Sequence, residues 1–263
     1  MTEERVRRRW PPLLWAIIAL PLWASITLLP AVLVGLATGT TNPPAWWLLP
    51  GMLFATPLML RIDQRVGPVS PPALWVPPVG WWSAAAFLAG CGVVILASEV
   101  GNILLSTREF VPLGSGEPGP TLTPWETAGL ALVNGVCLVG VLQGVVQRAL
   151  TVRWPRRWAL VGTVALGAIF GGGGFAFQFA LLLILPVWLF AQTRSLLPSM
   201  MALLPHAVPA LLEASGLSPG VPGFDLVRAN EVLWQPVWFN LLGAGLLAAG
   251  MAPLLRALGD EAK

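Results

Sequence analysis

The sequence predicts an all-α protein, a polytopic bundle of transmembrane helices that forms a single integral membrane domain over residues 1–263. Three observations predict this class. Only 10% of the residues are charged, against about 25% in soluble domains. The mean hydropathy is +0.75, and the uncharged stretches reach the roughly 20 residues that a helix needs to cross a bilayer. A water-soluble globule is excluded, as is a disordered chain, which requires low hydrophobicity and high net charge.

Breaks in the uncharged stretches divide the chain into about eight helical spans. The first stretch must hold two helices, because two prolines and a turn-prone Asn at positions 39–44 stop helix propagation. The run of glycines at 171–174 divides another stretch in two. The expected spans are 12–37, 45–60, 79–105, 125–148, 158–171, 174–192, 196–213 and 232–255. The second and the fifth of these are short for a full crossing.

The distribution of basic residues predicts that the N- and C-termini are both cytoplasmic. Lys and Arg concentrate in cytoplasmic loops. Eight crossings that begin inside place 13 of the 15 basic residues on that side, with only Arg108 and Arg228 outside. The long apolar run at 13–36 favours a retained first helix over a cleaved signal peptide. We therefore expect a multi-pass protein of the plasma membrane, which is the inner membrane in a bacterium.

No motif in the sequence indicates a cofactor or a metal. Cys91 and Cys137 both fall inside spans, where a disulfide is not expected. The sequence has no Cys/His cluster, no Walker-type loop and no Gly-x-Ser-x-Gly turn. The arginine clusters are typical of anchors to anionic lipids. The expected partners are the lipid bilayer and a membrane-embedded peptide or protein, and nucleic-acid binding is disfavoured.

A few uncharged polar or acidic side chains lie inside the expected spans, and such residues are candidates for function. Glu99 and Asn102 are three residues apart, so they share a helix face near the outer end of the third span. Together with Asn134 they form a candidate polar cavity. The alternative is a structural role, in helix capping or helix–helix hydrogen bonding.

Two basic side chains inside the spans are further candidates. Arg148 ends the fourth span, and its simplest interpretation is an arginine that snorkels to the interface. His206 is the sole histidine and lies between Pro205 and Pro209. Prolines remove backbone donors, so this segment predicts either a polar pocket or a simple proline kink.

Three segments within 124–212 occur in a suggestive order and spacing. They are Gln-Gly-Val-Val-Gln-Arg at 143–148, Phe-Gly-Gly-Gly-Gly at 170–174 and His-Ala-Val-Pro-Ala at 206–210, the last preceded by Gln-Thr-Arg-Ser-Leu-Leu-Pro at 192–198. The order resembles the core of the CAAX-protease and bacteriocin-processing (CPBP, Abi-type) family of eight-helix intramembrane endopeptidases. That family's motifs are Glu-Glu-x-x-x-Arg, Phe-x-x-x-His and His-x-x-x-Asn.

The departures from these motifs bear on activity. In the family, paired glutamates activate a water and histidines help to polarise the peptide carbonyl. The vestigial motif positions here are Gln143, Gly144, Arg148, Phe170, Gly174, His206 and Ala210, of which only Arg148, Phe170 and His206 match the family. A glutamine amide cannot act as a general base at neutral pH. We expect no acidic residue beside the first motif, and therefore no local counter-ion for Arg148.

Three functional interpretations follow. The favoured one is a catalytically inactive member of this family that binds or assists in the processing of membrane peptides or lipoproteins. The second is an active endopeptidase whose base is Glu99 or Glu126. The third is a non-enzymatic transporter subunit or assembly partner, because the small residues at 171–174 and 243–245 permit close helix packing.

Overall fold

The computed structural model describes residues 11–40, 45–66, 80–106, 123–172, 176–217, 219–224 and 233–261, and every regular element in these ranges is a helix. The all-α class is therefore confirmed. The elements are α1 (Pro12–Thr38), η1 (Ala45–Trp47), α2 (Leu48–Val66), α3 (Trp81–Ser106), α4 (Pro124–Val141), η2 (Leu142–Gln147), α5 (Arg148–Arg153), α6 (Arg156–Gly172), α7 (Ala176–Thr193), α8 (Leu196–Leu203), η4 (Leu204–Ala207), α9 (Val208–Ala214) and α10 (Val237–Glu261).

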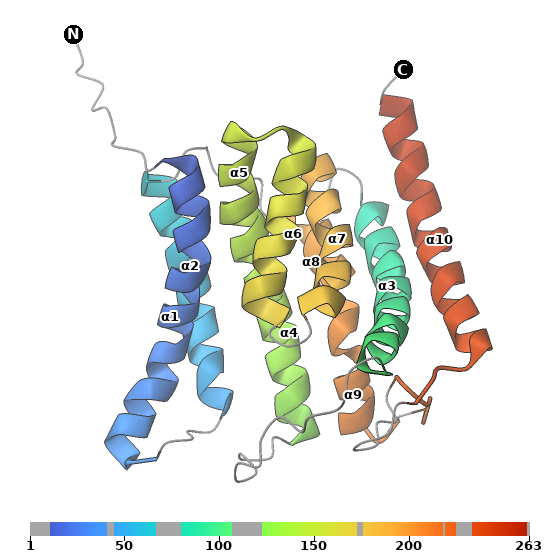
Figure 1. Cartoon of the computed structure of the whole chain (residues 1–263), viewed down its shortest axis with the longest axis horizontal. Coiled ribbons are helices and arrows are strands. Elements are labelled where there is room, and N and C mark those ends of the chain that lie inside the picture. Colours follow the sequence, from blue (N-terminus) through green and yellow to red (C-terminus); the bar gives the residue numbers. More distant parts are fainter. Residues whose placement is uncertain are drawn as a thin grey trace.

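The helices pack side by side with their axes roughly parallel (Figure 1). The pair α1 and α2 forms one edge of the bundle, the pair α3 and α10 forms the other, and the continuous helix α4–η2–α5 runs between them. The hairpin of α6 and α7 stops well short of the end that α4 and α9 reach (Figure 1). The beginning of α1 and the end of α10 lie at the same end of the bundle.

Local sequence signals explain where several helices begin and end. Pro12 and Pro124 are the first residues of α1 and α4, where the missing N–H of proline is harmless. At the start of α4, Thr123 and Glu126 form a reciprocal capping box. After α1, Gly39 adopts a left-handed conformation with φ 68°, which glycine tolerates without steric cost.

Among the described residues, five helices are long and apolar enough to cross a membrane: Pro12–Thr38, Trp81–Leu104, Pro124–Arg153, Ala176–Thr193 and Val237–Ala257. The chain is thus a multi-pass membrane protein. The remaining three expected spans correspond to α2, which carries three charged residues near its end, to α6, which has 17 residues, and to the shorter apolar segment Leu196–Leu212.

Three helices differ from the expected spans by more than two residues at one or both ends. The second helix continues past residue 60 to Val66, the fourth continues past residue 148 to Arg153, and the last begins at Val237 and continues to Glu261. The predicted spans of these three helices ended at or just before a charged residue: Arg61, Arg148 and Arg256. Charged residues do not end a helix, however, and Arg is a good helix former, so the hydrogen-bonded helix continues beyond the apolar stretch.

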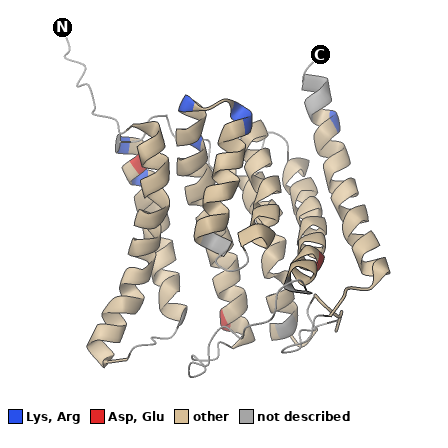
Figure 2. Ribbon diagram, in the orientation of Figure 1, with Lys and Arg blue, Asp and Glu red and all other residues tan. Residues whose placement is uncertain are grey.

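The described basic residues gather at one end of the bundle, called the basic end below (Figure 2). They lie on α2, α5, α6 and α10 and in the short connection between α7 and α8. This distribution is the one that the positive-inside rule predicts for a cytoplasmic face. The arginines before Trp10, together with Arg108, Arg228 and Lys263, lie outside the described residues.

The largest cluster of buried apolar side chains forms where α1, α2 and the helix α4–η2–α5 meet, and it includes Trp15, Met59 and Leu142. The outer surface is also apolar: Leu36 is 76% exposed and Leu241 is 67% exposed. An extended apolar exterior around a packed core suits a lipid environment and would be a liability in water.

Candidate functional site

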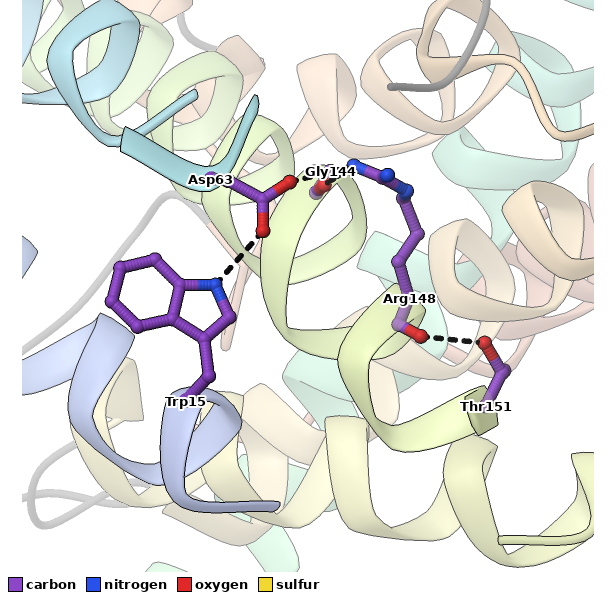
Figure 3. Close-up of polar contacts among 5 residues, drawn as sticks. All are labelled: Trp15, Asp63, Gly144, Arg148 and Thr151. Atoms are coloured by element: carbon purple, nitrogen blue, oxygen red, sulfur yellow. Dashed lines mark hydrogen bonds and ion pairs between the residues drawn. The ribbon is translucent and has the colours of Figure 1, made fainter. Parts of the chain in front are cut away.

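A buried ion pair joins α2 to α5 near the basic end (Figure 3). Nη1 of Arg148 donates a hydrogen bond of 2.8 Å to Oδ2 of Asp63 and one of 2.7 Å to the carbonyl oxygen of Gly144. The indole Nε1 of Trp15 donates to Oδ1 of Asp63 at 2.8 Å. Asp63 is 3% exposed and Arg148 4% exposed. Three separate stretches of chain therefore meet at one desolvated carboxylate.

Helix periodicity explains why Asp63 is buried while its charged neighbours are not. Asp63 is one turn beyond Met59, which is fully buried, so both face the core. Arg61 and Arg65 are each two positions away and are exposed on the other side of α2. Sequence reasoning missed Asp63 because it treated 61–65 as a loop. The four-residue spacing from Met59 is the signal that could have found it.

This pair corrects two expectations. Arg148 does not snorkel to the interface, because its side chain is buried and paired with Asp63. An acidic group does lie beside the first-motif positions, and it comes from α2, 85 residues away in sequence. A local reading of the motif could not reveal it, since the missing glutamate would have been one turn from Arg148 on the same helix.

The first-motif residues Gln143, Gly144 and Gln147 lie on η2, a turn of π-helix inserted between α4 and α5, and Arg148 is the first residue of α5. Insertions of π-helix are rare in proteins overall, but those that occur are often found at functional sites. Gln143 is completely buried, and neither its Oε1 nor its Nε2 has a hydrogen-bond partner in the described structure. Gln147 donates from Nε2 to the carbonyl of Val187 at 2.9 Å, while its Oε1 has no partner among the described residues. The turn therefore places two amides in the apolar core.

Gly144 faces side chains of two other helices. A Cβ built on it would lie 3.0 Å from Cδ2 of Leu60 and 3.7 Å from Cδ1 of Leu196. A glutamate at this position would have to displace those leucines. The first-motif region is thus a closed, packed part of the core, with its charge confined to the Asp63–Arg148 pair.

His206 lies on the 3₁₀ turn η4, between α8 and α9. Its side chain is exposed at the surface of the bundle. It contacts Phe179 of α7 edge-on, with ring centroids 6.3 Å apart. The two flanking prolines therefore coincide with an interrupted helix, and the imidazole faces outward, away from the buried polar groups of the first motif.

The first motif and His206 lie at different depths. The contact between Gly144 and Leu196 places the start of α8 beside η2. Further along, a Cβ on Gly135 would lie 3.7 Å from Leu203, so α8 and α4 run antiparallel. His206 is ten residues beyond Leu196, which is about 15 Å further along the bundle. The first-motif residues and His206 therefore do not line a common site.

Glu99 and Asn102 belong to a separate polar cluster near the end of α3. Nδ2 of Asn102 donates to Oε2 of Glu99 at 3.1 Å and to the carbonyl of Gly223 at 2.9 Å. The backbone N–H of Gln235 donates to the same Glu99 oxygen at 3.1 Å. Ser98 also donates to the Gly223 carbonyl, at 3.0 Å. The predicted shared face is confirmed, and the cluster fastens the segments around 223 and 235 to α3.

The remaining predicted site residues are scattered. Asn134 and Ala210 are half-buried on α4 and α9. Phe170, on α6, is 47% exposed. Gly174 lies outside the described residues. Glu126, the alternative base, accepts two hydrogen bonds from Thr123 through Oε2 in the exposed capping box.

Within the described ranges, no three His, Cys, Asp or Glu side chains are close enough to hold a metal ion. No protein-family model, curated protein or solved structure matches this chain. The resemblance carried by residues 143–148 and 206 therefore stays a prediction, and function has to be argued from the geometry.

Proposed function

We propose that this chain is a multi-pass plasma-membrane protein with a CPBP-like core over 124–212 and without peptidase activity. Its role is to bind membrane-embedded peptides or lipid-modified protein tails, or to assist a protein that processes them. Eight membrane crossings with both termini in the cytoplasm are part of the same proposal.

The Asp63–Arg148 pair is the observation that carries the proposal. A general base must reach a water and accept its proton. The Asp63 carboxylate is desolvated and already accepts hydrogen bonds from Arg148 and Trp15. Gly144 has no side chain to contribute, and Gln143 is a neutral amide. The acidic charge beside the first motif thus neutralises Arg148 within the core, and no group there is arranged to activate water.

The arrangement of the helices supports eight crossings. The described basic residues share one end of the bundle (Figure 2), and consecutive long helices alternate in direction (Figure 1). The short α6–α7 hairpin returns to the basic end, so it preserves this alternation even though it stops short of the opposite end. A cytoplasmic basic end is what anionic lipids and the positive-inside rule favour.

Peptidase activity is tested on the purified protein reconstituted in liposomes, with prenylated peptides and a transmembrane peptide as substrates and mass spectrometry to detect products. We expect no cleavage above that of empty liposomes, for the wild type and for His206→Ala alike. An active CPBP peptidase, assayed in parallel, shows that each substrate can be cleaved. The active-enzyme alternative would be established instead if the wild type cleaved a substrate and if His206→Ala, Glu99→Gln or Glu126→Gln abolished that cleavage.

Binding is tested separately, because an inactive protein need not be a binding protein. A fluorescent prenylated peptide and a fluorescent transmembrane peptide are titrated with the protein in nanodiscs, and anisotropy is measured. Saturable binding to at least one of them, absent with empty nanodiscs, is expected. Equal signals with and without the protein would contradict the binding role and leave the non-enzymatic assembly partner as the better interpretation.

A further inference from the structure

A groove of about 750 Å³ opens on the outer surface of the bundle between α3 and α10. Its lining is almost wholly apolar and includes Trp81, Ala84 and Leu88 of α3, Met201 of α8, and Ala249 and Pro253 of α10. The small side chains leave the space open, and Trp81 is 39% exposed at its border. The volume is within the range of about 300–1,000 Å³ typical of ligand pockets.

Close packing of the two helices fixes the depth of this groove. A Cβ on Gly250 would lie 2.4 Å from the backbone nitrogen of Ala89 and 2.6 Å from the carbonyl oxygen of Ala85. Leu254 packs with Trp82 in the same buried cluster. Because α3 and α10 are antiparallel, the first turn of α3 is level with the last turns of α10. The groove therefore lies in the half of the bundle nearest the basic end.

A positive charge follows directly on the face of α10 that lines the groove. Ala249, Pro253 and Arg256 are spaced by four and three residues, so they lie on one face of the helix. Arg256 is exposed. On α3, Trp81 stacks on Trp82 with ring centroids 5.7 Å apart. Tryptophan at the end of a spanning helix is typical of the headgroup region of a bilayer.

We propose that this groove is a binding site for an anionic phospholipid. An acyl chain occupies the apolar part, and the headgroup phosphate contacts the guanidinium of Arg256. Guanidinium groups bind phosphate oxygens in a bidentate manner, and the basic end attracts anionic more than zwitterionic headgroups. The proposal is independent of whether the protein binds peptides, since it rests only on the membrane environment and on this surface.

The test is native mass spectrometry of the full-length protein released from detergent after incubation with equal amounts of phosphatidylglycerol and phosphatidylcholine. For the wild type we expect one retained lipid, with phosphatidylglycerol preferred about fivefold over phosphatidylcholine. This ratio corresponds to an attraction of about 1 kcal/mol between one basic group and an anionic lipid. Ala249→Leu, which fills the groove, should reduce retention of both lipids several-fold. Arg256→Gln should keep the lipid and lose the preference.

Two matched variants separate the groove from general effects. Ala244→Leu adds the same bulk to an exposed position of α10 outside the groove, and Arg153→Gln removes an exposed charge at the basic end from another helix. Both should behave like the wild type. Equal retention of the two lipids by the wild type, or equal losses in Ala249→Leu and Ala244→Leu, would overturn the proposal. So would a dimer that Ala249→Leu dissociates, because the groove would then be an interface between copies.

Discussion

Burying a charged side chain in an apolar bundle costs several kcal/mol unless an opposite charge and further hydrogen bonds compensate it. Arg148 has both kinds of compensation, from Asp63 and from the carbonyl of Gly144. Asp63 in turn accepts the indole N–H of Trp15. The stability of the core at the meeting point of α1, α2 and α5 therefore depends strongly on this one carboxylate.

Asp63→Asn is expected to destabilise the protein by about 3–5 kcal/mol, because it leaves the Arg148 charge buried without a counter-ion. The measurement is equilibrium unfolding in detergent micelles, followed by circular dichroism. Glu126→Gln, at a partly exposed acidic position in the first turn of α4, should change stability much less, by about 1 kcal/mol or under.

The double variant Asp63→Leu/Arg148→Met distinguishes the loss of the pair from the cost of a lone charge. It should be more stable than Asp63→Asn, because replacing a buried ion pair with apolar residues is often neutral. If Asp63→Asn proved no less stable than Glu126→Gln, the buried ion pair would not be needed for the stability of the core. The Asp63–Arg148 pair would then no longer support the proposed function.

Gln143 is the second residue whose replacement is informative. Its amide is fully buried and has no partner among the described residues, and an unsatisfied buried polar group costs about 1–3 kcal/mol. Gln143→Met keeps the length of the side chain and should leave stability unchanged or raise it by up to that amount in the same unfolding assay. Gln147→Met, which loses the bond to Val187, should be less stable than Gln143→Met. A large loss of stability in Gln143→Met would reveal a bonded role for its amide.

At the scale of elements, α3 and α10 approach each other through glycine. A Cβ on Gly92 would lie 2.5 Å from the carbonyl oxygen of Gly243, and one on Gly250 would lie 2.4 Å from the backbone nitrogen of Ala89. Only glycine allows backbones to come this close, as in other membrane helix pairs. The small residues at 243–245 that suggested packing in the sequence are confirmed in that role at Gly243.

Two single variants, Gly250→Ala and Gly245→Ala, test this contact, because they make the same chemical change at a packed and at an open position of α10. Gly250→Ala forces the two helices apart and should destabilise the protein by about 1–3 kcal/mol. Gly245 has no atom within 4 Å of a built Cβ, so Gly245→Ala should be neutral or stabilising by about 0.5–1 kcal/mol, since alanine is the better helix former. Thermal unfolding in detergent measures both. Equal effects of the two changes would mean that α10 is not tightly packed on α3.

At the scale of the whole molecule, the proposal of cytoplasmic termini and alternating crossings can be checked from four exposed positions. In a background without the native cysteines, single cysteines replace Thr40 and Leu217, near the end opposite the basic end, or Gln64 and Val152, near the basic end. A membrane-impermeant maleimide should label the first two in intact cells and the other two only after permeabilisation. Labelling of Gln64→Cys or Val152→Cys from outside would invert the proposed orientation.

Much of the architecture could be predicted because it depends on properties that add up along the chain. Hydropathy over about 20 residues marked the long helices, and the breaks at 39–44 and 171–174 separated their neighbours correctly. Helix ends near charges, such as Val66 and Arg153, were placed too early, because the criterion measured apolar length while the helix follows backbone hydrogen bonding. The counter-ion of Arg148 could not be predicted, since it comes from α2.

The sequence by itself determined that this is an all-helical, multi-pass membrane protein, because a chain that crosses lipid needs long apolar helices. It also determined that the described basic residues lie at one end, because Lys and Arg concentrate in the loops on the cytoplasmic side of a membrane. Only the tertiary structure decided what those charges and polar groups do. It paired Arg148 with Asp63, buried Gln143, left His206 exposed and opened a groove between α3 and α10. These outcomes depend on which helices pack against one another. The spacing from Met59 can indicate that Asp63 is buried, but neither local segment indicates that Asp63 and Arg148, 85 positions apart, are in contact.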